Sequence, residues 1–183
     1  SQASIKTKSF LGNPMFIGSS NVFNKKAIDM LDTIVENPVD IFGLVSKYAL
    51  TKENENFNCK GYQEDTSSIF ETACFSMCPL FLGTGSKIKI QESLANATPV
   101  VAMIDSGLNS GIVHGVNGFL CYTTQEFKKY CDILYKDRDL CSKMGKAAVE
   151  INESKASKSL SFKEYFEILL RVKTAKKGGK NAR

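Results

Sequence analysis

The residues best suited to chemistry in this sequence lie in one stretch, where a glycine-containing loop precedes a helical pattern. Gly83 and Gly85, with Thr84 between them and Ser86 after them, would let the backbone approach a ligand closely. The free amides at the start of the following helix favour an anion, and a diphosphate suits such a place. Alone this loop is a weak signal, because it is neither a complete dinucleotide fingerprint nor a phosphate loop ending in Gly-Lys-Ser/Thr.

Two lysines and a glutamate follow the loop. Lys87 and Lys89 fall in the first helical turn, where a cation opposes the helix dipole and costs about 0.3 to 1 kcal/mol. Two cations at this place make sense if an anion arrives to offset them. Glu92, one turn later, could accept hydrogen bonds from a ribose hydroxyl. An ordinary salt bridge between Lys89 and Glu92 on a solvated helix face is the alternative, and spacing alone does not decide between the two.

Short apolar runs alternate with helical patterns along the chain, which predicts parallel strands joined by crossover helices. We expect strands at 14–18, 39–46, 57–62, 73–80, 99–104 and 119–122, and helices at 24–37, 64–72, 86–97, 124–135, 139–152 and 161–172, with a glycine-rich loop over 105–118. The predicted fold class is α/β, a Rossmann-like, mostly parallel sheet with helices on both faces. In such sheets ligands bind at the carboxyl ends of the strands.

Length and charge bound the possibilities. A chain of 183 residues, 43% of them hydrophobic, suits one globular domain. The net charge of +5 comes from an acid-free tail, whose basic residues are Lys173, Lys176, Lys177, Lys180 and Arg183. We therefore expect a domain over 14–172, a disordered basic tail over 173–183, and an interdomain linker or the edge of the expressed piece over 1–13. No nucleic-acid partner is expected, and membrane contact only through the tail or a further domain.

The remaining composition points to a soluble, cytoplasmic protein without a metal. No apolar run approaches the length of a membrane span, and residues 1–13 lack the hydrophobic stretch of a signal peptide. The six cysteines are expected to be reduced and mostly buried: Cys59, Cys74, Cys78, Cys121, Cys131 and Cys141. Since His114 is the one histidine, they are not expected to form a zinc site.

Three runs in order carry a resemblance to a known family: PLFLGTGSKIKIQESLA (79–95), TPVVA (98–102) and HGVNGFL (114–120). They resemble the C-terminal domain of glycosyltransferases built from two facing Rossmann-like domains, the GT-B architecture. Within it they are most similar to the retaining enzymes called group 1 or family four. The similarity continues in FIGSSNVFN (16–24), FNCKGYQED (57–65), KDRDLCSKMG (136–145) and SFKEYFEILL (161–170), and so covers nearly the whole chain.

The resemblance implies roles for individual residues. Gly83 and Gly85 match the family's loop glycines, Lys87 its basic residue near the phosphates, and Glu92 the glutamate that holds the ribose. Gly18 and Ser19 match the first glycine turn, which faces the same cleft. Thr84, Ser86 and Lys89 complete the expected nucleotide-sugar site, and no catalytic residue is assigned.

Two positions depart from the family's pattern. Thr84 stands where many members have a glutamate, and Ser19 or Ser20 where an arginine is often found. The resemblance implies a domain that binds a UDP- or GDP-sugar, without a further cofactor, in an enzyme that transfers the sugar with retention and without a metal. A separate N-terminal domain would supply the acceptor site. A non-catalytic binding module and a sugar-nucleotide epimerase remain the alternatives.

For several other residues, a structural or solvated position is the alternative to a functional role. Asp137-Arg138-Asp139 spells the Asp-x-Asp pattern that holds a metal in other glycosyltransferases, but its position favours carboxylates at a helix N-terminus. His114 either contacts a donor sugar or is a solvated loop residue. The polar residues after the 99–104 strand either contact the donor or form a solvated turn: Asp105, Ser106, Gly107 and Asn109.

Overall fold

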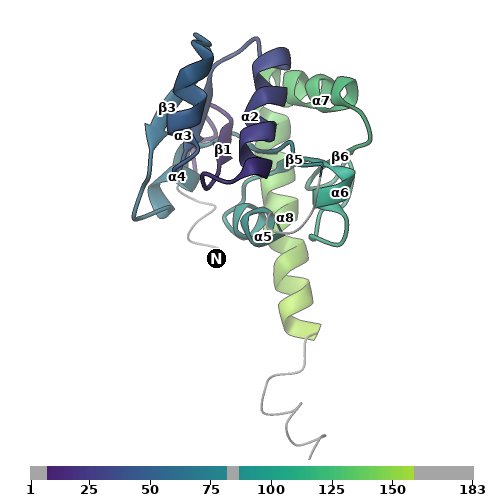
Figure 1. Ribbon diagram of the computed structural model, residues 1–183. Helices are drawn as coiled ribbons and strands as arrows, with labels where there is room; N and C mark the ends of the chain where they lie inside the picture. Colours follow the sequence, from purple (N-terminus) through teal and green to yellow (C-terminus); the bar gives the residue numbers. More distant parts are fainter. Residues whose placement is uncertain (1–7, 82–86, 159–183) are drawn as a thin grey trace, which may run out of the picture. The chain divides into compact units, whose positions relative to one another are not determined.

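The computed structural model describes residues 8–81 and 87–158. The chain divides into two compact units, residues 1–150 and 151–183. The whole sheet belongs to the first unit (Figure 1). The predicted closing helix at 161–172 and the basic tail at 173–183 lie outside the described residues.

The described part of the chain forms a six-stranded sheet in which every pairing is parallel. The strands are β1 (Met15–Ile17), β2 (Val39–Phe42), β3 (Phe57–Gly61), β4 (Ser76–Cys78), β5 (Val100–Met103) and β6 (Gly118–Cys121). Their order is β3-β2-β1-β4-β5-β6. This is the doubly wound Rossmann order, so the predicted fold class is confirmed.

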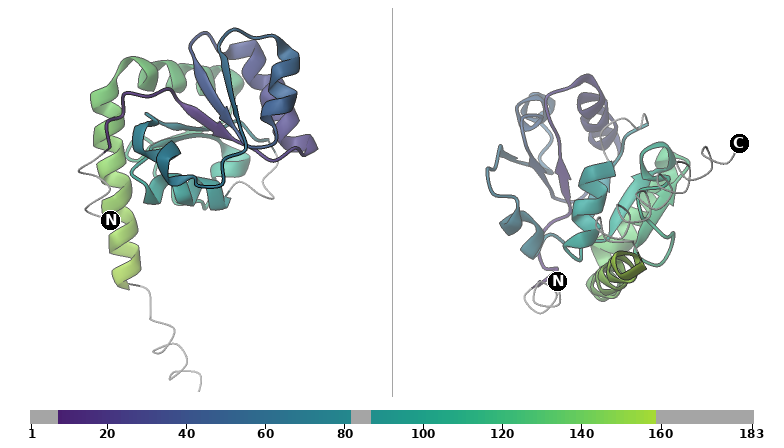
Figure 2. Two further views of the ribbon diagram at one scale, coloured as in Figure 1. Left: turned by 90° about the vertical axis from the view of Figure 1, so that its left-hand side faces the viewer. Right: turned by 90° about the horizontal axis from the view of Figure 1, so that it is seen from below.

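Helices connect the strands or follow the last of them, and they cover both faces of the sheet (Figures 1 and 2). They are α2 (Val22–Ile34), α3 (Ser46–Ala49), the 3₁₀ turn η1 (Leu50–Lys52), α4 (Ser67–Thr72), α5 (Lys87–Ala95), α6 (Ile104–Gly107), α7 (Thr124–Lys136) and α8 (Arg138–Lys158). The β1-to-β2 and β4-to-β5 crossovers step in opposite directions along the sheet. Because such crossovers share one hand, α2 and α5 lie on opposite faces.

Alternating side chains of β1 show the two covered faces. Met15 packs against Ile69 and Phe70 of α4. Phe16, the next residue, belongs to the larger core that also contains Leu31 of α2. Neighbouring residues of a strand point to opposite faces, so β1 is buried on both sides as a central parallel strand should be.

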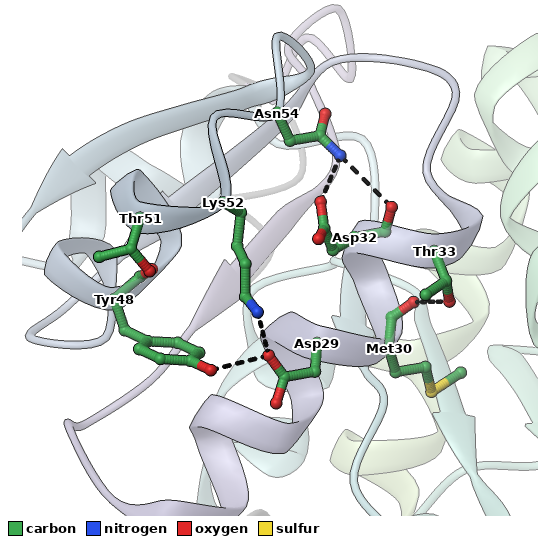
Figure 3. A network of polar contacts seen from close by, with 8 residues as sticks. All are labelled: Asp29, Met30, Asp32, Thr33, Tyr48, Thr51, Lys52 and Asn54. Carbon is green, nitrogen blue, oxygen red and sulfur yellow. Dashed lines mark hydrogen bonds and ion pairs between the residues drawn. The ribbon is translucent and has the colours of Figure 1, made fainter.

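Polar contacts fasten α3 and η1 to α2 (Figure 3). Lys52 Nζ lies 2.5 Å from Asp29 Oδ1, which also accepts a hydrogen bond from the Tyr48 hydroxyl at 2.9 Å. The hydrogen bond from Lys52 lowers the pKa of the Asp29 carboxyl. Asn54 Nδ2 donates to Asp32 Oδ1 at 2.9 Å one turn farther along α2. These contacts hold the β2-to-β3 connection against α2.

Two predicted segments were wrong in detail. The strand expected over 39–46 ends at Phe42, because Gly43 takes a left-handed φ of +86° and the chain then enters α3 at Ser46. The loop expected over 105–118 begins with the short helix α6. Both elements have only four residues, too few to show a helical period.

Residues 8–13, which we expected to belong to an interdomain linker or to the edge of the expressed piece, pack within the first unit. The amides of Ser9 and Gly12 donate to the carbonyls of Glu71 and Thr72, at 3.2 and 2.9 Å. Phe10 is buried. These residues therefore contribute to the packing of the first unit.

Candidate functional site

The turn between β1 and α2 is shaped by one glycine and two asparagines. A Cβ on Gly18 would lie 2.8 Å from Val45 Cγ1, so only glycine fits there. Asn24 is buried, and its Nδ2 donates to the carbonyl and the hydroxyl oxygen of Ser19, at 2.9 and 3.1 Å. Asn21 caps α2 by accepting from the Asn24 amide at 2.8 Å. The turn is thus held by neutral groups.

Lys89 of α5 reaches across to the end of β1. Its Nζ donates to the Ile17 carbonyl oxygen at 2.6 Å. Burial lowers the pKa of Lys89, and the nearby Cys78 and Glu92 oppose that shift. An ammonium has three donors, and among the described residues this is its one hydrogen bond. Two donors therefore remain for a ligand, in surroundings where a charge interaction is stronger than in water.

Two pockets lie at the carboxyl ends of the strands, on either side of Lys89. The first, here the β4 pocket, has a volume of about 140 Å³ and lies between the β1–α2 turn and the residues of β4 and α5. The second, the β2 pocket, has a volume of about 210 Å³ and lies beyond the ends of β1 and β2. Ile17, Ser19 and Lys89 line both pockets. Figure 1 shows the start of α2 and helix α5 at the same end of the strands.

The position and charge of these pockets match a site for an elongated anion. Sheet order reverses between β1 and β4, the place where open α/β sheets bind ligands. Each pocket is smaller than the roughly 300–1,000 Å³ of a usual small-molecule site, so a nucleotide would extend over both. Among the described residues, Lys89 is the one charged side chain that lines either pocket. A ligand that spans them therefore passes an ammonium group.

Glu92 lies on the side of α5 that faces α4. Its Oε1 accepts a hydrogen bond from Thr66 Oγ1 at 3.1 Å, and Thr66 also lines the β2 pocket. No ion pair joins Lys89 to Glu92 within the described part of the chain. The salt-bridge alternative for these two residues is therefore not what the structure shows, and the carboxylate remains next to a pocket.

The remaining predicted site residues of this segment form two groups. Lys87 is exposed as the first residue of α5 and lines neither pocket, while the neighbouring Ile88 is 75% exposed. The helix therefore begins at the open surface. Gly83, Thr84, Gly85 and Ser86 lie outside the described residues.

Sequence reasoning missed Asn24, Thr66 and Tyr62. Asn24 stands three residues after the cap of α2, a position whose polar side chain can fold back on the preceding turn, and this signal could have been read. Tyr62 follows β3 directly and lines the β2 pocket with 70% of its surface exposed. Thr66 carries no local signal, because its partner is 26 residues away.

Comparison with known families decides the assignment. The sequence model of the family described as Glycosyl transferases group 1 matches residues 15–137. This chain belongs to that family. No curated protein sequence matches it.

Solved structures of several other proteins share the fold. S. aureus TarM, in complex with Fondaparinux, alpha-GlcNAc-glycerol and UDP, has a TM-score of 0.65 at 18% identity over 80% of this chain and 33% of TarM. Anabaena HepE, with UDP and glucose, has a TM-score of 0.62 at 16% identity over 85% of this chain and 49% of HepE. This chain thus spans a third to a half of those proteins.

A single-domain relative shows which half is shared. The C-terminal domain of the group 1 protein LpcC from Francisella tularensis has a TM-score of 0.60 at 14% identity, over 79% of this chain and 86% of that domain. The resemblance to the C-terminal half of a GT-B glycosyltransferase is therefore confirmed. At these identities the likeness concerns the fold.

Residues with competing interpretations can now be placed in this group 1 domain. Asp137 Oδ1 accepts from the Leu140 amide at 2.8 Å and Asp139 lies in the first turn of α8, as the helix N-terminus interpretation predicts. His114 Nδ1 accepts from the Leu120 amide at 3.1 Å, and its ring packs edge-on against Phe119. His114 lines neither pocket.

The polar residues after β5 lie in and beside α6 and line neither pocket. Ser106 is buried and donates to the Met103 carbonyl oxygen at 3.1 Å. A Cβ on Gly107 would lie 2.4 Å from a methyl of Leu120. Asp105 and Asn109 are exposed. Packing accounts for Ser106 and Gly107 without a ligand.

All six cysteines fall within the described residues and none of them forms a disulfide; five are buried and Cys59 is half-buried. Burial raises the pKa of Cys121 to about 12. The expectation of reduced, mostly buried thiols is confirmed. None of the described helices combines the length and the apolar character needed to cross a membrane.

Proposed function

We propose that this group 1 domain binds the sugar donor of a glycosyltransferase that moves a sugar from UDP or GDP to an acceptor. The observation that carries the proposal is the place of Lys89. It is partly buried at the reversal point of the sheet, and it lies between two pockets that contain no other charged side chain among the described residues. A cation in that setting suits a diphosphate.

The proposed orientation of the bound donor is based on the residues around the two pockets. The diphosphate lies near Lys89 and the open start of α5, where backbone amides also favour anions. The ribose lies near Glu92, and the base extends into the β2 pocket beside Tyr62. As the sugar leaves, negative charge grows on the diphosphate, and Lys89 stabilises that charge.

Further parts of the proposal rest on the family rather than on geometry. We propose retention at the anomeric carbon, cytoplasmic location, and an N-terminal domain that supplies the acceptor site. Lys89, Lys87 and the helix amides would hold the diphosphate without a metal. UDP in the TarM and HepE structures supports a nucleotide partner.

Calorimetric titration of the chain with UDP, GDP and the matching nucleosides tests donor binding. We expect one diphosphate to bind at least about tenfold more tightly than its nucleoside, since each charge-assisted hydrogen bond contributes about 1.5–3 kcal/mol. Absence of binding by both diphosphates would refute the proposal.

An assay of donor turnover distinguishes a glycosyltransferase from a binding module and from an epimerase. Together with an N-terminal acceptor domain, the chain should transfer the sugar of the donor that it binds. A binding module would hold that donor unchanged, and an epimerase would convert its sugar without transfer.

A further inference from the structure

Thr66 does not make the capping hydrogen bond that a threonine at the start of a helix usually makes. A threonine at the cap position of a helix normally accepts a hydrogen bond from a backbone amide of the first turn. Thr66 occupies the cap position of α4, but its side chain makes no capping bond. Its hydroxyl donates instead to Glu92 Oε1 at 3.1 Å. The hydroxyl therefore serves another helix.

The neighbouring aspartate replaces the missing cap. Asp65 Oδ1 accepts from the Ser67 amide at 2.8 Å, and this bond lowers the pKa of the Asp65 carboxyl. The first turn of α4 thus has an acceptor that does not depend on Thr66. Loss of the Thr66 hydroxyl should leave α4 capped.

The bond restricts a side chain that would otherwise move freely. A glutamate has several rotamers, and fixing one costs free energy when a ligand must do it alone. Thr66 occupies one acceptor position of Oε1, while a carboxylate offers about four lone-pair sites in all. Acceptor positions therefore remain for hydroxyl groups of a ligand beside the β2 pocket.

We propose that Thr66 is a positioning residue, which holds the Glu92 carboxylate in the orientation that accepts the ribose hydroxyls of the donor. This inference rests on the proposed function. The hydroxyl of Thr66 does not itself touch the ligand in this role, so its effect should depend on ribose hydroxyls being present.

The test compares UDP with 2′,3′-dideoxy-UDP by calorimetry, or GDP with its dideoxy analogue if the wild-type chain prefers guanine. Thr66→Val should lower affinity for the ribonucleotide about fivefold to tenfold and leave affinity for the dideoxy analogue unchanged. Thr66→Ser should restore wild-type affinity. Thr51→Val is the matched control, because it removes an exposed hydroxyl that donates to the Tyr48 carbonyl oxygen and lines neither pocket (Figure 3).

Each result has a distinct meaning. Equal losses for both probes would indicate a general structural effect and overturn the inference, as would unchanged affinity of Thr66→Val for the ribonucleotide. If Thr66→Val fails to fold, Thr66→Ala removes the same hydroxyl without the branched side chain and must show the same dependence on the ribose hydroxyls. A wild-type chain that binds neither UDP nor GDP overturns the proposed function, and this inference with it.

Discussion

Replacing Lys89 by methionine should weaken nucleotide diphosphate binding much more than the same change at Lys87. Methionine keeps the length and flexibility of the side chain and removes the charge. Lys87 lies two positions earlier in α5 and is exposed, so Lys87→Met is a matched control within one helix turn. Both substitutions remove one positive charge, so a difference in affinity between them reports the position of the lysine.

The magnitude follows from the surroundings of the two ammonium groups. Lys89 is partly buried, which lowers the pKa of its ammonium, and it lines both pockets. Two of its donors are free among the described residues, so loss of one or two charge-assisted bonds of about 1.5–3 kcal/mol should cost at least about tenfold in affinity. An exposed lysine contributes about 0–1 kcal/mol, which is at most about fivefold.

The assay is calorimetric titration with UDP and GDP at neutral pH, and thermal unfolding of each variant without ligand. Lys89→Met loses the bond to the Ile17 carbonyl but also removes the cost of burying a charge, so its unfolding free energy should stay within about 1.5 kcal/mol of wild type. Equal losses of affinity at the two positions, or none at Lys89, would refute the reasoning.

Two further predictions concern stability, measured by chemical denaturation. Burial lowers the pKa of Lys8 from 10.5 to about 8. Between these two pH values the unfolded chain binds more protons than the folded chain. The free energy of unfolding of the wild type should therefore rise by about 2 kcal/mol relative to Lys8→Met as pH increases from about 7 to about 9.5. A pH-independent difference would contradict this. Gly43→Ala should cost about 3 kcal/mol, because its Cβ would lie 2.2 Å from the Gly18 carbonyl oxygen at a φ of +86°. Gly61→Ala, with a φ of +72° and nothing within 4 Å, should cost about 1 kcal/mol, and equal costs would exclude the clash as the cause.

The sheet could be predicted from the sequence because every strand except β3, which contains Asn58 and Lys60, lies in a separate apolar run. Buried parallel strands leave that signal whatever their neighbours are. Strand order does not, since it depends on which runs pair in space. The order is known from the strand pairings of the folded chain.

The candidate site could be predicted in its location but not in its contacts. Lys87 and Lys89 are two positions apart in a helix, so their side chains leave it on nearly opposite sides and only one can face a given pocket. That argument was available from the sequence, but not which of the two lysines it would select. The bond between Thr66 and Glu92 joins two helices and needed the folded chain.

The neutral β1–α2 turn explains why so much depends on one lysine. Ser19, which with Ser20 is one of the two positions where the family resemblance leads us to expect an arginine, is held by the side-chain amides of Asn21 and Asn24. Those bonds keep the turn in shape without bringing a cation to it. The described pockets therefore have one ammonium, and the second source of attraction is the open start of α5. Under the proposed function the ligand is a diphosphate with at least two negative charges, and we expect the helix amides to stabilise the part that Lys89 does not reach.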